Sequence, residues 1–176
     1  MAQDATPFAR SPFTTSAARE HGLGRDDLSE LRRQGLIRRV VRGVYVDAAE
    51  PDSLGLRARS LSLVVPDGVV VSVRTAAWLW GAPIADLRAH QDLPPVDLTA
   101  PSGRAAPRRV MVVGHSAPLL PRDVHEFGSG LVATTPLRTA ADIARLLTRP
   151  DALATLDGLL AHTALDESEL LAELER

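Results

Sequence analysis

The spacing of apolar residues is helical up to about residue 35 and strand-like after it. Leu28 and Leu31 lie three positions apart, on one face of a helix predicted over residues 25–34. A shorter helix is predicted just before it, over residues 16–21. The residues that cap or end these helices are Thr14 or Thr15, Gly22 and Gly35.

After the second helix the chain becomes rich in β-branched residues. Residues 36–41 and 44–46 are predicted strands, separated by a turn at Arg42-Gly43. Two short helices joined by a tight turn and followed by a basic hairpin have the order of a winged helix-turn-helix. In that fold the second helix enters the major groove of DNA and the hairpin touches the backbone.

The rest of the chain mixes both patterns. The charge changes sign after Asp47 and Pro51 interrupts the chain, so a boundary is expected at 48–52. We therefore predict a flexible arm at 1–12, a winged helix-turn-helix at 13–47 and a mixed α+β domain at 53–176, an α+β fold overall. Helices are expected over 53–65, 74–80, 136–147 and 151–162 and from 166; strands over 69–71, 96–99, 109–114, 124–127 and 131–133. Residues 85–94 are expected to form a loop, Ser72 and Thr135 to cap helices, and Arg149-Pro150 to break one.

Composition removes several classes of function. The 176 residues contain no cysteine, which excludes disulfides, cysteine-bound zinc and a thiol nucleophile. All 20 basic residues are arginine, so a Walker A loop and Schiff-base chemistry are excluded as well. Apolar runs are short and the N-terminus has no signal-peptide pattern, so a cytoplasmic protein without a membrane partner is expected.

Positive charge is concentrated near the N-terminus. Residues 10–46 carry eight arginines against four acidic residues, and no acidic residue lies between Arg32 and Val46. A local basic patch on a protein of net charge −2 is typical of a protein that binds the phosphate backbone.

The candidate DNA-binding residues come from the second helix and the hairpin. Arg25, Ser29 and Arg32 share one helix face through i, i+4, i+7 spacing. Arg38 and Arg39 are neighbours on a strand, so one is expected to face DNA and the other a helix or an acidic residue. The full set is Arg25, Ser29, Arg32, Arg33, Arg38, Arg39 and Arg42.

Other polar and aromatic residues have simpler interpretations. For Asp26 and Asp27 we favour a role in capping the second helix over hydrogen bonding to the amino groups of cytosine. Trp78 and Trp80 are expected to place one indole in the core and the other partly at the surface. Arg138 and Asp142 are spaced to form a buried i, i+4 ion pair.

We expect no catalytic residues, no metal site and no cofactor. The five histidines lack metal-ligand spacing, and residues 114–118 do not form a G-x-S-x-G nucleophile elbow.

Three segments, taken in order, resemble one family. They are residues 13–46, ending in Val41-Arg42-Gly43-Val44-Tyr45-Val46; residues 71–81, with Ser72 and Thr75-Ala76-Ala77; and residues 135–142, with Pro136 and Arg138-Thr139. The chain is similar across about 13–160 to AbiEi-type antitoxins and transcriptional regulators. The resemblance implies a DNA-binding antitoxin that represses its own operon in a type IV toxin–antitoxin or abortive-infection system. It also implies two partners, double-stranded operator DNA and a nucleotidyltransferase-like toxin encoded nearby.

Two alternatives stay open. Similar N-terminal regions precede a DUF559 domain, with a Vsr-like endonuclease fold, in longer actinobacterial proteins, so the chain could be the DNA-targeting part of such an enzyme. It could also be an interaction module that no longer binds DNA. That alternative predicts that Arg38, Arg39 and Arg42 are neutralised by acidic residues of the same chain.

Overall fold

The computed structural model describes residues 11–83 and 95–175. The expected arm and the loop expected at 85–94 therefore lie mostly or wholly outside the described residues. Contacts divide the chain into two compact units, Met1–Val65 and Pro66–Arg176. This division falls after the 48–52 boundary expected from charge and from Pro51.

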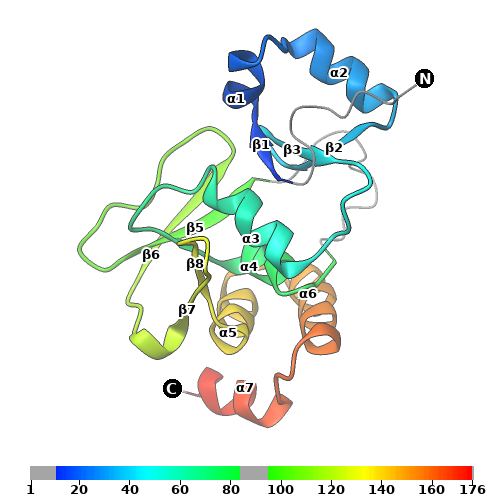
Figure 1. The fold of residues 1–176 in the computed structure, drawn as a ribbon. Coiled ribbons are helices and arrows are strands. Elements are labelled where there is room, and N and C mark those ends of the chain that lie inside the picture. The colour runs from blue at the N-terminus through cyan, green and yellow to red at the C-terminus, as the bar shows by residue number, and fades with distance from the viewer. Residues whose placement is uncertain (1–10, 84–94, 176) are drawn as a thin grey trace. The chain divides into compact units, whose positions relative to one another are not determined.

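The first unit contains the two helices and the hairpin of a winged helix, together with one further helix (Figure 1). Strand β1 pairs antiparallel with β3, which pairs antiparallel with β2, so the sheet order is β1-β3-β2. The two-residue β1 was not expected from the sequence. The elements are β1 (Phe13–Thr14), α1 (Thr15–Glu20), α2 (Arg25–Arg33), β2 (Ile37–Val41), β3 (Val44–Asp47) and α3 (Leu54–Ser62).

Local chemistry explains where the first helices begin and end. The backbone N–H of Ala17 donates to Thr14 Oγ1 at 3.1 Å, so Thr14 is the N-cap. Gly22 and Gly35 follow the two helices with φ of 81° and 70°, a conformation that glycine adopts without strain. The core beneath the helices is formed by Phe13, Ala18, Leu28 and Ile37.

The second unit is built on a mixed five-stranded sheet of order β6-β5-β4-β8-β7. Its central strand β4 is antiparallel to β5 and parallel to β8, while β5 and β6 run parallel. The strands are β4 (Val70–Val71), β5 (Val96–Pro101), β6 (Val112–Ala117), β7 (Val124–Glu126) and β8 (Val132–Thr134); a short 3₁₀ turn, η1 (Pro121–Asp123), precedes β7.

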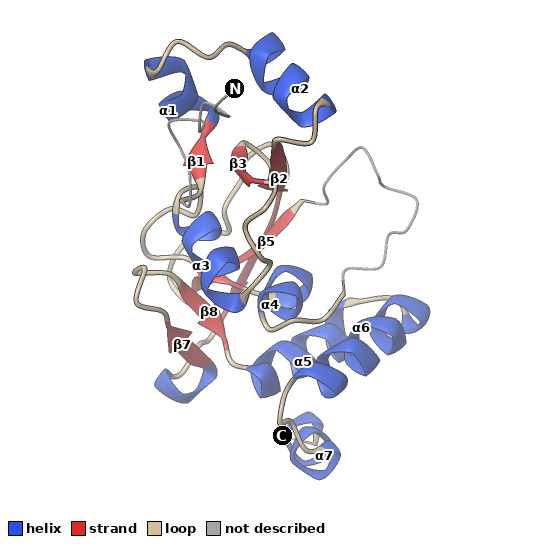
Figure 2. Ribbon diagram, turned by 45° about the vertical axis from the view of Figure 1, so that its right-hand side comes forward, coloured by secondary structure: helices blue, strands red, loops and turns tan. Residues whose placement is uncertain are grey.

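Four helices complete this unit, and they contact one another (Figure 2). Helix α5 contacts α4, α6 and α7. Alanines supply much of their core, which explains how the unit packs with few aromatic residues. The helices are α4 (Val73–Leu79), α5 (Pro136–Leu146), α6 (Arg149–His162) and α7 (Glu167–Leu174).

Three expectations for the second unit need correction. Strand β6 begins at Val112 rather than 109, because the preceding residues form a loop. Helix α5 ends before Arg149-Pro150, as expected, but α6 already begins at Arg149 rather than at 151, since proline needs no N–H partner in a first turn. The Ser72 hydroxyl makes no cap hydrogen bond to α4; instead it accepts one from Thr99 Oγ1 at 2.8 Å.

Candidate nucleic-acid interface

Helix α2 separates its charges between its two flanks. Successive residues of an α-helix are rotated by about 100°, so Arg25, Ser29 and Arg32 lie on one flank, and Asp27 and Glu30 lie toward the other. All three residues of the first flank are exposed. Ser29 Oγ donates to the Arg25 carbonyl at 3.0 Å, which leaves its oxygen lone pairs available to a ligand.

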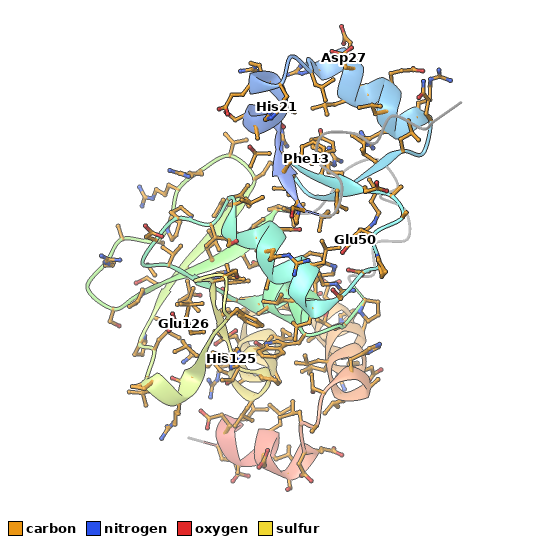
Figure 3. The ribbon with its side chains drawn as sticks, viewed as in Figure 1. Phe13, His21, Asp27, Glu50, His125 and Glu126 are labelled. Atoms are coloured by element: carbon orange, nitrogen blue, oxygen red, sulfur yellow. The ribbon has the colours of Figure 1, made fainter. Side chains whose placement is uncertain are left out.

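The acidic flank of α2, on which Figure 3 labels Asp27, makes hydrogen bonds within the helix and to its N-cap. The Asp27 carboxylate accepts from the Gly24 N–H at 2.7 Å, as expected of a capping residue. Glu30 accepts from Arg33 at 2.6 Å and from Gln34 at 2.6 Å, and the Arg33 bond, followed by that of Gln34, holds the pKa of Glu30 below its ordinary value. The Arg33 side chain is 74% exposed, so this pair is weak and exchangeable.

The wing places its arginines in different surroundings. Arg42 is exposed at the tip, where Gly43 adopts φ of 79°. Arg38 Nη2 donates to the Glu50 carbonyl at 2.9 Å. Asp52 has a lowered pKa because it bonds to Arg57 and, to a lesser degree, because it lies in the field of Arg38. Arg38 therefore interacts with residues that follow the hairpin in the chain, Glu50 and Asp52.

Arg39 is half-buried and lies opposite Tyr45 on β3. The register shifts between Arg39 and Val41, so the hairpin bulges just before its tip. On the other side of the turn, Thr15 Oγ1 donates to the Gly43 carbonyl at 3.4 Å and ties the tip to α1.

Three of the predicted arginines keep their charge uncompensated. Within residues 11–83 and 95–175, the guanidinium groups of Arg25, Arg32 and Arg42 have no ion pair or hydrogen bond. Neutralisation of the wing by acidic residues, which the interaction-module alternative requires, does not extend to Arg42. The exposed arginines of α2 and the wing are thus available to a polyanion.

Arg138 of the second unit behaves in the opposite way. Arg138 Nε donates to Asp142 at 2.9 Å, and Arg138 Nη1 donates to the Pro118 carbonyl at 3.0 Å and to Asp123 at 3.4 Å. The expected i, i+4 pair is confirmed, and Asp123, which joins it, was not anticipated. Burial raises the pKa of Asp142, while Arg138 opposes that shift.

A second, partly buried polar pair was missed by sequence reasoning. His115 Nε2 lies 3.3 Å from Asp97 Oδ1 across the parallel strands β5 and β6. Burial raises the pKa of Asp97, and His115 and Arg74 oppose the shift. No spacing along the sequence could reveal this pair, because strand register brings the residues together.

Trp78 on α4 and Trp80 at the end of that helix are both half-buried. The sequence had predicted one indole in the core and the other partly at the surface. Trp80 Nε1 donates to the Thr134 carbonyl at 2.8 Å, and its ring contacts His125 and Phe127 at centroid distances of 5.5 Å. Trp78 lines a hollow of about 50 Å³ beside the Arg74–Asp151 ion pair.

Comparison with known families assigns both units. Residues 69–176 match the sequence profile described as the AbiEi antitoxin C-terminal domain. Residues 6–46 match the profile described as a transcriptional regulator, AbiEi antitoxin. The chain belongs to the AbiEi antitoxin family. The predicted family and the predicted α+β fold with an N-terminal winged helix are both confirmed.

Related sequences and structures were also found. Two uncharacterized proteins of Mycobacterium tuberculosis, MT2308 and Rv2248, are each 34% identical over 141 residues, covering 80% of this chain and 47% of the relative. This chain thus spans about half the length of the curated relatives it matches. The crystal structure of the RV2827C protein of the same organism aligns with a TM-score of 0.38 and 22% identity, covering 94% of this chain and 66% of the other.

Two kinds of feature are absent from the described part of the chain. No helix there is long and apolar enough to cross a membrane. No group of three or more metal-ligating side chains gathers within the same part of the chain.

Proposed function

We propose that this AbiEi-family protein binds double-stranded DNA through α2 and the wing and represses transcription from its own promoter. The observation that carries this proposal is the set of exposed guanidinium groups of Arg25, Arg32 and Arg42, which have no partner among the described residues of the chain. Such groups bind phosphates and the guanine edge with charge-assisted hydrogen bonds.

The surroundings of each residue suggest a division of roles. Arg25, Ser29 and Arg32 face the major groove, and an arginine there reads guanine through two hydrogen bonds. Arg33, Arg39 and Arg42 contact phosphates, with Arg33 released from Glu30 when DNA is present. Arg38 supports the wing, because its guanidinium group donates to the Glu50 carbonyl of the same unit.

A reporter gene placed under the protein's own upstream DNA tests repression. We expect the wild type to lower reporter output, and Arg32→Ala, Arg39→Ala and Arg42→Ala to restore it. Arg59→Ala is the matched control, because Arg59 is exposed on α3 of the same unit. Full repression by all three variants, at wild-type protein levels, would contradict the proposal.

We also propose that the chain acts as the antitoxin of a nucleotidyltransferase-like toxin encoded nearby. Family membership supports this role. The test is co-expression with the neighbouring gene, in which the wild type rescues growth. In type IV systems the antitoxin need not touch its toxin, so rescue by a variant that no longer binds DNA would separate the two roles.

A second candidate function is favoured by the length of the relatives, of which this chain covers 47%. The chain would then be the DNA-targeting part of a longer protein of the Vsr-like endonuclease type. An open reading frame that continues past Arg176 into such a domain would support this candidate. A stop codon there, with a toxin gene alongside, would overturn it.

A further inference from the structure

A second basic stretch lies in the second unit, outside the winged helix. Residues 98–122 contain Arg104, Arg108, Arg109 and Arg122 and no acidic residue. Residues 142–176, by contrast, carry eight acidic residues and three arginines. Three of the four arginines lie in the loop 102–111, which joins β5 to β6 (green in Figure 1).

Hydrogen bonds fix the backbone of this loop near both of its ends. Arg104 Nη1 donates to the Gly68 carbonyl at 2.9 Å, and the Arg104 carbonyl accepts from Ser116 Oγ at 3.2 Å. The Arg109 carbonyl accepts from the Val112 N–H at 3.1 Å, and the Met111 carbonyl accepts from the Val96 N–H at 2.9 Å.

Close packing holds the middle of the loop against the sheet. A Cβ atom added to Gly114 on β6 would lie 2.0 Å from the Pro107 carbonyl oxygen, so only glycine allows this approach. The backbone on either side of the loop tip is therefore anchored, and little conformational entropy is lost when the tip binds a ligand.

The tip itself projects into solvent. Arg108 and Arg109 are exposed and make no side-chain hydrogen bond or ion pair within the described part of the chain. Val110 beside them is 89% exposed, and Met111 has φ of 64°, a conformation that is costly for a residue with a side chain. Proteins that bind the minor groove also combine basic side chains with apolar side chains that enter the groove.

We propose that the loop 102–111 is a second contact for duplex DNA, in which Arg108 and Arg109 bind backbone phosphates and Val110 faces the groove. The proposal deepens the proposed function, since duplex DNA is the partner in both. It assigns the second unit a direct part in DNA binding, through a surface separate from α2 and the wing.

Salt dependence of binding to a random-sequence 40-base-pair duplex tests the loop without knowledge of an operator. Each lost phosphate contact lowers the slope of log affinity against log salt by about 0.9. We expect the double variant Arg108→Gln/Arg109→Gln to lower the slope by about 2. Between 50 and 200 mM salt, its loss of affinity is then about tenfold smaller than that of the wild type. Val110→Ser should weaken binding at every salt concentration and leave the slope unchanged.

Controls separate this proposal from the previous one. Arg149→Gln removes an exposed arginine of the same unit and should leave the slope at the wild-type value. Arg42→Ala tests the wing alone: if it has no effect while the double variant lowers the slope, the loop proposal stands and the wing assignment fails. A wild-type slope in the folded double variant overturns the loop proposal. Tighter, Arg108/Arg109-dependent binding to a single-stranded RNA 40-mer overturns the choice of duplex DNA.

Discussion

The exposed arginines of α2 and the wing and the buried Arg138 of the second unit serve opposite purposes. In the first, Arg25, Arg32 and Arg42 stand in solvent with their charge uncompensated. In the second, Arg138 has a side chain only 15% exposed and holds two buried carboxylates, those of Asp123 and Asp142. The comparison teaches that positive charge predicts a binding surface only when the fold leaves it without acidic neighbours.

The largest expected effect comes from removing the buried arginine. Arg138→Ala leaves Asp123 and Asp142 buried without their cation, which should lower the free energy of unfolding by about 3–5 kcal/mol. Urea denaturation measures the change. Arg122→Ala is the control, because the Arg122 side chain is 63% exposed and 3.8 Å from Asp123, and its loss should cost under about 0.5 kcal/mol. An equal loss of unfolding free energy in the two variants would contradict the comparison.

The exposed arginines should show the reverse behaviour. Arg32→Ala should lower affinity for the specific duplex by about 1–3 kcal/mol, because a bidentate guanine contact is lost. Arg42→Ala should weaken specific and scrambled duplexes alike and lower the salt slope by about 0.9. Neither should change the urea midpoint. Anisotropy titrations check the affinities, and a fall in stability in either variant would contradict the interpretation of an open surface.

Arg38 sharpens the comparison, because it lies in the basic wing but bonds within its own unit. Arg38→Ala should cost about 1 kcal/mol of stability through the lost bond to the Glu50 carbonyl. For this variant, the slope of log affinity for DNA against log salt concentration should equal that of the wild type. A reduced slope with unchanged stability would return Arg38 to the phosphate-binding set.

The smallest effect concerns the partly buried Asp97–His115 pair. Burial raises the pKa of Asp97 in the folded state above the ordinary 3.8, so the folded state holds this proton more tightly than the unfolded state. The contribution of Asp97 to stability therefore falls as pH rises from that ordinary value through the raised one. Asp97→Asn cannot ionise, so its stability relative to the wild type should increase across the same interval. Unfolding free energies from pH 3 to 7 measure this, with exposed Asp67→Asn as the control; a pH-independent difference would contradict the assignment.

Local patterns were sufficient to predict most helices and the hairpin. Helix α2 follows from the Leu28–Leu31 spacing, and the cap at Thr14 follows from its hydroxyl. Strand β1 could not be predicted, because two residues acquire strand character only by pairing with Tyr45 and Val44. The basic residues of α2 and the wing follow from the sequence, but the contact that Arg38 makes depends on Glu50, twelve residues away.

The features that were missed arise from contacts between distant segments. Asp97 meets His115 through parallel strand register. The loop 102–111 stands out only when its anchors at Gly68 and Gly114 are known, since these fix the backbone and leave Arg108 and Arg109 exposed. The charge of such residues can be read from the sequence. Whether that charge is paired with a residue of the same chain depends on the tertiary structure.

Fluorescence anisotropy of the full chain on its own upstream DNA, against a scrambled duplex at two salt concentrations, tests the central claim most directly. The account predicts binding to the native duplex that is tighter by at least about a thousandfold, with scrambled binding weak and falling steeply as salt rises. Equal affinity for both duplexes, or no binding to either, would contradict a sequence-specific repressor that acts through α2 and the wing.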